Sequence, residues 1–163
     1  MKSIVKLLFG IAVLCAPLAA SANAQETLQA RVISYGVFTS KFSAKDDKNR
    51  RDVVKDEKLV SQTATIVAKI GTEFGFTFQI DGAPKGKEVE LRVLTKFPPK
   101  GIKDEQNDTL FETESRIVVR AGEASYEGFQ FESQRELVPG EWSFALYAGE
   151  TRLAERKFNV VLK

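Results

Sequence analysis

Apolar and polar residues alternate with a period of two over much of the chain, which is the pattern of β-strands with one buried face. The clearest stretches are residues 73–80, 88–97 and 142–146. Each places an apolar stripe on one face of its strand: Phe74, Phe76, Phe78 and Ile80; Val89, Leu91, Val93 and Phe97; Trp142, Phe144 and Leu146. Aromatic stripes at strand spacing are far more often core than ligand site, so we expect them to meet inside the protein, with Trp142 at the centre.

Further strands are expected where shorter alternating runs are separated by turn residues. Their ranges are 28–38, 59–70, 115–121, 125–132 and 152–161. Only one helical turn is expected, near residues 51–59. About eight strands with frequent turns predict an all-β fold, an antiparallel β-sandwich of immunoglobulin-like type in a single domain over residues 25–163. A small closed β-barrel is the alternative.

The segment 45–58 (KDDKNRRDVVKDEK) mixes both charge signs densely and reads as a loop. It is either a binding loop for a charged partner, with Arg50 and Arg51 as candidate contacts, or a solvated connection that blunts a sheet edge. Interleaved charges of opposite sign cancel at a distance, which favours the second interpretation.

A second loop begins at Phe97, Pro98 and Pro99, where an aromatic residue at a strand end meets a rigid segment. These residues either form an exposed apolar patch for a partner or plug the end of the sandwich, and we favour the plug. Further along, Asp104 and Asp108 are spaced like the start of a calcium loop. The glycine and the closing glutamate of such a loop are missing, so we expect a polar loop and no metal site.

The N-terminus has the parts of a secretory signal peptide. Lys2 and Lys6 precede an apolar run over residues 7–18, and the string Ala22-Asn23-Ala24 is a small-residue cleavage site. The apolar run is shorter than the roughly 20 residues that a membrane span needs. We therefore expect cleavage between Ala24 and Gln25, no stable membrane anchor after cleavage, and a bacterial protein that is periplasmic or secreted.

Removal of the signal changes the composition. The chain has 24 Lys and Arg residues, two of them in the signal, against 22 Asp and Glu residues, so the mature protein is neutral. A neutral domain has no electrostatic footprint for nucleic acid, and we expect none to bind. The chain has no His, and its only Cys and only Met lie in the signal. Serine–histidine and cysteine–histidine nucleophiles are therefore excluded, and zinc, copper and haem sites lose their usual ligands.

Several short strings resemble an uncharacterised family of exported bacterial proteins that is catalogued as a domain of unknown function. The strings are Phe74-Gly75-Phe76, Pro98-Pro99-Lys100-Gly101, Leu137-Val138-Pro139-Gly140-Glu141-Trp142, Leu153-Ala154 and Phe158-Asn159-Val160. The resemblance covers most of the mature chain. It implies an envelope location and a sandwich fold, and it assigns no catalytic residue.

The residues favour a non-enzymatic periplasmic binding or protein-interaction module, whose partner is an envelope protein or glycan. We expect no catalytic residue and no cofactor. Two alternatives stay open. One is a carboxylate-dependent hydrolase of envelope glycans, which needs two carboxyl groups facing each other across a cleft. The other is a carrier of a small apolar ligand, which needs a closed barrel with an interior cavity.

Overall fold

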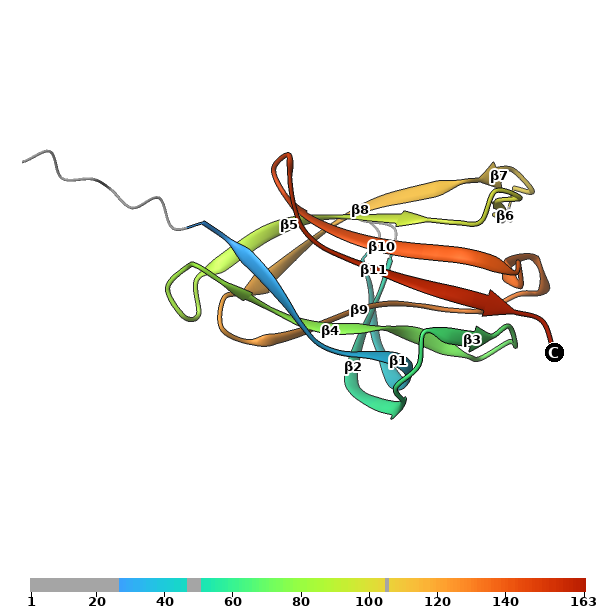
Figure 1. The fold of residues 1–163 in the computed structure, drawn as a ribbon, viewed down its shortest axis with the longest axis horizontal. Coiled ribbons are helices and arrows are strands. Elements are labelled where there is room, and N and C mark those ends of the chain that lie inside the picture. Colours follow the sequence, from blue (N-terminus) through green and yellow to red (C-terminus); the bar gives the residue numbers. More distant parts are fainter. Residues whose placement is uncertain (1–26, 47–50, 105) are drawn as a thin grey trace, which may run out of the picture.

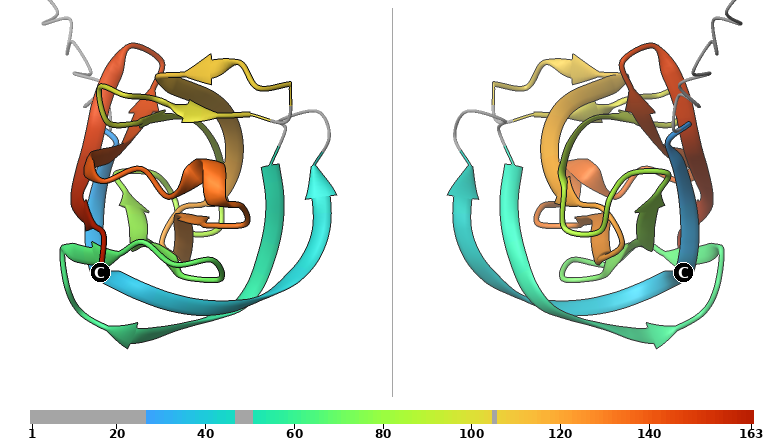
Figure 2. Two further views of the ribbon diagram at one scale, coloured as in Figure 1. Left: turned by 90° about the vertical axis from the view of Figure 1, so that its right-hand side faces the viewer. Right: turned by 90° about the vertical axis from the view of Figure 1, so that its left-hand side faces the viewer.

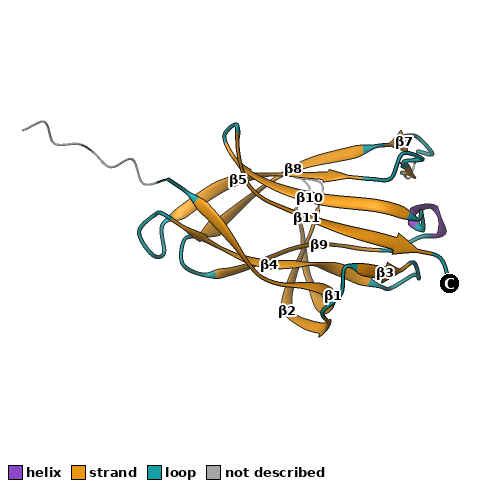
Figure 3. Ribbon diagram, in the orientation of Figure 1, coloured by secondary structure: helices purple, strands orange, loops and turns teal. Residues whose placement is uncertain are grey.

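The computed structural model describes residues 27–46, 51–104 and 106–163, and gives only the backbone of residues 45, 46 and 51–53. These residues form strands joined by turns and one short 3-10 helix, as Figure 3 shows. The elements in chain order are β1 Gln29–Asp46, β2 Arg51–Ser61, β3 Thr65–Val67, β4 Glu73–Asp81, β5 Glu88–Lys96, β6 Ile102–Lys103, β7 Thr109–Leu110, β8 Glu112–Arg120, β9 Ala124–Gln130, η1 Gln134–Glu136, β10 Gly140–Ala148 and β11 Thr151–Val161.

Two main sheets face each other. Sheet A has the strand order β2-β1-β4-β9, and sheet B has the order β3-β11-β10-β5-β8. All pairs in them are antiparallel except β11 with the short β3. Strands β6 and β7 form a separate two-stranded piece beside one end (Figure 1). The sheets do not close into a barrel, so the predicted immunoglobulin-like β-sandwich is confirmed over the barrel alternative.

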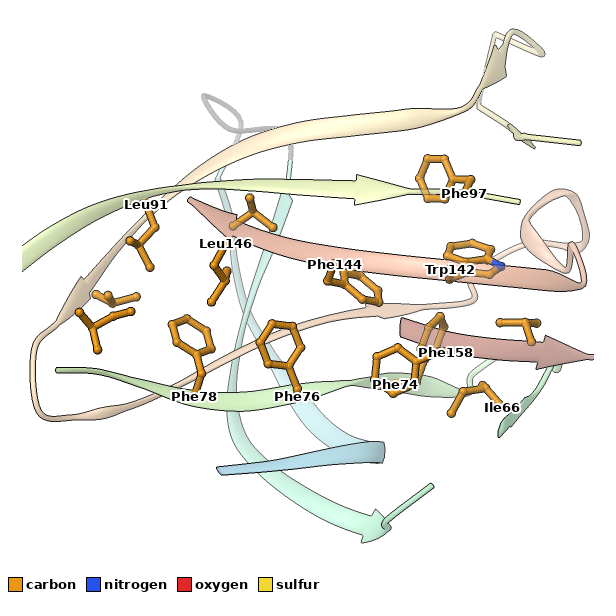
Figure 4. Packing of buried hydrophobic residues seen from close by; sticks show 14 of the residues in the cluster. Ile66, Phe74, Phe76, Phe78, Leu91, Phe97, Trp142, Phe144, Leu146 and Phe158 are labelled. Carbon is orange, nitrogen blue, oxygen red and sulfur yellow. The ribbon is translucent and has the colours of Figure 1, made fainter. Parts of the chain in front are cut away.

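The aromatic stripes meet between the sheets, as expected. Phe74 of β4 lies within 6 Å of three rings of sheet B, at centroid distances of 5.7 Å to Trp142, 5.8 Å to Phe144 and 5.3 Å to Phe158. Figure 4 shows these side chains pointing toward one another from both sheets. Trp142 has no exposed surface, which confirms it as a central core residue. The stripes therefore fill a core and do not line a cavity.

The expectation of a loop over residues 45–58 was wrong in its described parts. Strand β1 continues to Asp46, eight residues beyond the predicted end at Phe38, and β2 begins at Arg51. The helical turn expected near 51–59 is also strand. Both strands leave the sandwich here, so neither face has to be apolar and the period-two pattern disappears.

The predicted strand over residues 59–70 is two strands. Strand β2 ends at Ser61, and β3 covers only Thr65–Val67 before a turn at Gly71. The short strands β3, β6 and β7 raise the number in the described residues to eleven, against about eight expected. Strands of two or three residues contain too few positions to show a periodic pattern.

Candidate functional site: the projecting ribbon

The hairpin of β1 and β2 extends beyond sheet A as a two-stranded ribbon. Strand β1 pairs with β4 as far as the Phe38–Glu73 pair, and beyond that point only with β2. We call residues 39–46 and 51–58 the ribbon. Figures 1 and 2 show it running across the direction of the other strands, on the side where β8 and β9 are the edge strands. The ribbon is therefore the element that departs most from a plain sandwich.

The ribbon is irregular along its length. Its register shifts between Thr39 and Lys41 and again between Phe42 and Ala44. Asp56 has a φ of 57°, a left-handed conformation that a β-bulge accommodates. Bulges twist a strand and disturb its free edge, so the β2 edge is poorly shaped for continued sheet pairing.

The ribbon exposes an aromatic residue. Phe42 is 60% exposed and pairs across the ribbon with Val54. Nearby, Leu59 and Val60 on the same hairpin are 39% and 64% exposed. The surrounding charges are partly paired, because Lys41 Nζ lies 3.1 Å from Asp56 Oδ2. The ribbon thus exposes apolar side chains next to charged residues of both signs, of which Lys41 and Asp56 form an ion pair.

A shallow hollow of about 460 Å³ lies on the ribbon, lined by Thr39, Ser40, Lys41, Asp56, Glu57 and Lys58. Its acids, Asp56 and Glu57, are neighbours on one strand and do not face each other across a cleft. Asp56 is already paired with Lys41. The hollow does not provide the facing carboxyl groups that glycoside hydrolysis requires.

Two buried acids lie on sheet A, and the sheet separates them. Glu73 and Glu127 are each 5% exposed. Glu127 pairs with the inward-facing Phe76, and paired residues of antiparallel strands share a face. Glu73 alternates with the inward Phe74 and so lies on the outer face. The two carboxyl groups cannot act together on one substrate.

Glu73 instead contacts the base of the ribbon. Ser40 Oγ donates a 2.8 Å hydrogen bond to Glu73 Oε2. The ring of Phe38 lies 4.9 Å from that of Tyr126, a residue of β9 on the same outer face. Burial raises the pKa of Tyr126, and the charge of Glu73 raises it further, so the phenol stays protonated.

The residues predicted at the other loop pack into the end of the sandwich. Phe97 is 8% exposed, and its ring lies 4.9 Å from the indole of Trp142. Pro98 is buried against Gly140, and only Pro99 of the three is exposed. The structure therefore places Phe97 and Pro98 as a plug and leaves Pro99 as the accessible residue of this loop.

The structure does not describe the side chains of the remaining predicted residues. Arg50 is outside the described residues, as are Ala24 and Gln25 at the expected cleavage site. Arg51 begins β2, with only its backbone described. No helix among the described residues is long and apolar enough to span a membrane.

The loop with the calcium-like spacing forms a polar turn between β6 and β7. The backbone N–H of Asp108 donates to Asp104 Oδ1 at 2.8 Å, and Lys103 Nζ donates to Thr109 Oγ1 at 2.7 Å. Within the described part of the chain, no group of three or more His, Cys, Asp and Glu side chains is placed to hold a metal ion.

The contacts at the base of the ribbon, between Ser40 and Glu73 and between Phe38 and Tyr126, were not predicted from the sequence. Glu73 and Tyr126 lie within the predicted strands 73–80 and 125–132, and the local pattern of neither strand indicates that the two residues meet. One signal was present: glycines stand at Gly36, Gly75 and Gly128, within three predicted strands. Glycine inside a strand often marks a close approach of another segment.

Comparisons with known proteins agree with this architecture. A crystal structure of an immunoglobulin-like protein from Pseudomonas aeruginosa matches with a TM-score of 0.60 and 25% identity, covering 85% of this chain and 100% of that chain. A DNA-bound alkylpurine DNA glycosylase of Pseudomonas fluorescens matches with a TM-score of only 0.38 and 13% identity, over 60% of this chain and 27% of that chain, and carries no argument. Curated proteins give no match. Residues 26–160 match a family described as "Domain of unknown function (DUF3859)", and the chain belongs to that family.

Proposed function

We propose that this protein is an exported, non-enzymatic binding module of the bacterial envelope and that the ribbon contacts its partner protein. The observation that carries the proposal is the exposure of Phe42, 60% accessible on a ribbon that extends beyond the sheet. Exposed aromatic residues at projecting elements are typical anchors of protein interfaces.

Binding of a partner would also stabilise the ribbon itself. A two-stranded hairpin by itself is marginally stable in water, and it gains stability when one of its faces is packed. Burying an exposed phenylalanine side chain contributes about 2 kcal/mol. A partner that covers Phe42 and Val54 would therefore stabilise both the complex and the ribbon.

Export rests on the sequence of the first 24 residues, whose positive end, apolar middle and Ala22-Asn23-Ala24 site form a complete signal. We propose that the mature protein begins at Gln25 in the periplasm. Intact mass of the protein recovered by osmotic shock checks this proposal. A mass that includes the first 24 residues, or recovery in the cytoplasm alone, would contradict it.

The two alternative functions receive no specific support. The carrier needs a closed barrel, whereas the sheets form an open sandwich with a filled core. The hydrolase needs facing carboxyl groups, and the hollow on the ribbon presents adjacent ones.

The test compares three surface substitutions in a tagged chain captured from envelope extract. Phe42→Asp places a charge on the ribbon, Pro99→Glu places one at the sandwich end, and Val118→Asp is the control. Val118 suits this purpose because it is 63% exposed, much like Phe42, but lies on β8 of the other sheet.

We expect a partner, identified by mass spectrometry, to be lost with Phe42→Asp and retained with Val118→Asp. Retention in the Phe42 variant together with loss in the Pro99 variant would move the interface to the sandwich end. Equal recovery with all three variants would overturn the ribbon as the binding element.

A further inference from the structure

The direction in which the ribbon leaves the sandwich needs a physical cause. Strand β1 loses its partner β4 after the Phe38–Glu73 pair, while β2 continues beside it. From there no third strand of the described chain joins the ribbon. A two-stranded piece held only by its own hydrogen bonds would not hold one orientation.

A row of glycines crosses the outer face of sheet A beside this point. Gly36 pairs with Gly75, and Gly75 pairs with Gly128, across β1, β4 and β9. A Cβ atom added at Gly128 would lie 2.6 Å from Cζ of Tyr126. The absence of a side chain at Gly128 therefore leaves room for the Tyr126 ring, which packs against Phe38 at the base of the ribbon.

Four side chains meet over this row: Phe38 and Ser40 from β1, Glu73 from β4 and Tyr126 from β9. Phe38 is 4% exposed and its ring packs against that of Tyr126 at a tilt of 53°, and Ser40 donates to the Glu73 carboxylate. Phe38 also pairs with Leu59, so the contacts hold β2 as well as β1.

We propose that Phe38, Ser40, Glu73 and Tyr126 form a seat that holds the ribbon in one direction, and that the sandwich folds independently of this seat. The core lies on the other face of β4, where Phe74, Phe76 and Phe78 pack between the sheets. Breaking the seat therefore frees the ribbon and leaves the core packing in place. The consequence for binding rests on the proposed function: a partner would meet a ribbon already oriented, at a smaller entropic cost.

The experiment measures amide hydrogen exchange of the purified chain, without any partner. Ser40→Ala removes the hydrogen bond to Glu73. We expect exchange in the ribbon to become roughly tenfold faster, as the loss of one charge-assisted hydrogen bond implies. Core exchange and the emission of Trp142, the only tryptophan and fully buried, should not change.

Ser34→Ala is the matched control. Ser34 bonds Thr77 at 2.6 Å between the same two strands and on the same face, but away from the ribbon. It should leave ribbon exchange unchanged. A second pair of variants tests the contact between Phe38 and Tyr126. Tyr126→Ala should make hydrogen exchange in the ribbon faster, and Tyr126→Phe, which keeps the ring, should retain most of the protection from exchange.

Unchanged ribbon exchange in both Ser40→Ala and Tyr126→Ala would overturn the seat. Equally faster exchange in the core would overturn the independence of the sandwich. Because no partner is present, either result is separate from failure of the binding proposal.

Discussion

The indole Nε1 of Trp142 donates a 3.0 Å hydrogen bond to the backbone carbonyl of Val138, four residues earlier in the chain. The bond ties the segment after η1 to the start of β10. The ring itself packs among Phe97, Phe129 and Phe131, at centroid distances of 4.9, 5.0 and 5.5 Å. One side chain thus joins the sandwich core to the loops that close its end.

Substitution Trp142→Phe should remove both the hydrogen bond and part of the buried volume. We expect a loss of about 2–4 kcal/mol in the free energy of unfolding, because the smaller ring leaves a cavity and the Val138 carbonyl loses its donor. Urea denaturation followed by far-UV circular dichroism measures it. Phe111→Leu, at a 58% exposed position, should change the value by less than about 0.5 kcal/mol. A loss equally small for Trp142→Phe would contradict the central role of the indole.

Tyr126 should make stability fall at high pH. Burial raises its pKa above the ordinary 10.0, so the phenol stays neutral in the folded state while it ionises in the unfolded chain. The stabilising contribution is complete below about pH 10 and is lost as the pH rises further. Between about pH 8 and 11, the wild type should lose about 1 kcal/mol more than Tyr126→Phe.

Urea denaturation of both proteins at the two pH values gives this difference, in which the other titrating groups cancel. Ultraviolet difference titration of the folded wild type against Tyr126→Phe should also show that Tyr126 ionises well above its ordinary pKa of 10.0. Equal pH dependence of the two proteins would contradict a buried, protonated phenol.

Arg92 and Arg116 should differ in importance although both make cross-strand ion pairs. Arg92 binds Glu114 at 3.0 Å, lies 4.2 Å above the Tyr147 ring and is 26% exposed, whereas Arg116 binds Glu90 at 3.2 Å and is 68% exposed. We expect Arg92→Ala to cost about 1–2 kcal/mol through lost packing and cation–π contact. Arg116→Ala should cost less than about 0.5 kcal/mol, since exposed pairs contribute little. Thermal or urea unfolding compares them, and equal costs would refute the argument.

Arg156 should not tolerate replacement by lysine. Its guanidinium lies 3.3 Å from the centroid of the Tyr35 ring, on the inner side of β11 opposite Phe144. Lysine lacks the planar group that stacks on the ring, so Arg156→Lys should cost about 1 kcal/mol in unfolding free energy. Arg152→Lys, at an exposed pair with Glu155, is the control and should be nearly neutral. If both variants unfold at the same urea concentration, the stacking contributes nothing measurable.

The sequence by itself determined the strands that line the core, and the core residues on them. The stripes over residues 73–80, 88–97 and 142–146 each lie on a strand with one face in the core, and a period-two pattern is a local property that shows directly in the residues. The same holds for Trp142 as a central residue and for Phe97 at a closed strand end. A strand with one buried face needs an apolar residue at every second position, so apolar residues with this spacing indicate which face of the strand is buried.

Only the tertiary structure decided the ribbon and its seat. Most ribbon residues whose side chains are described are exposed, namely residues 39, 41–44, 55, 56 and 58, so no alternation marks these segments as strands, and their charges resemble a loop. The seat joins Phe38, Ser40, Glu73 and Tyr126, and the last of these is 88 positions beyond the first. The pairing of β1 with β4 and of β4 with β9 brings them together, and strand order and register depend on contacts far apart in sequence.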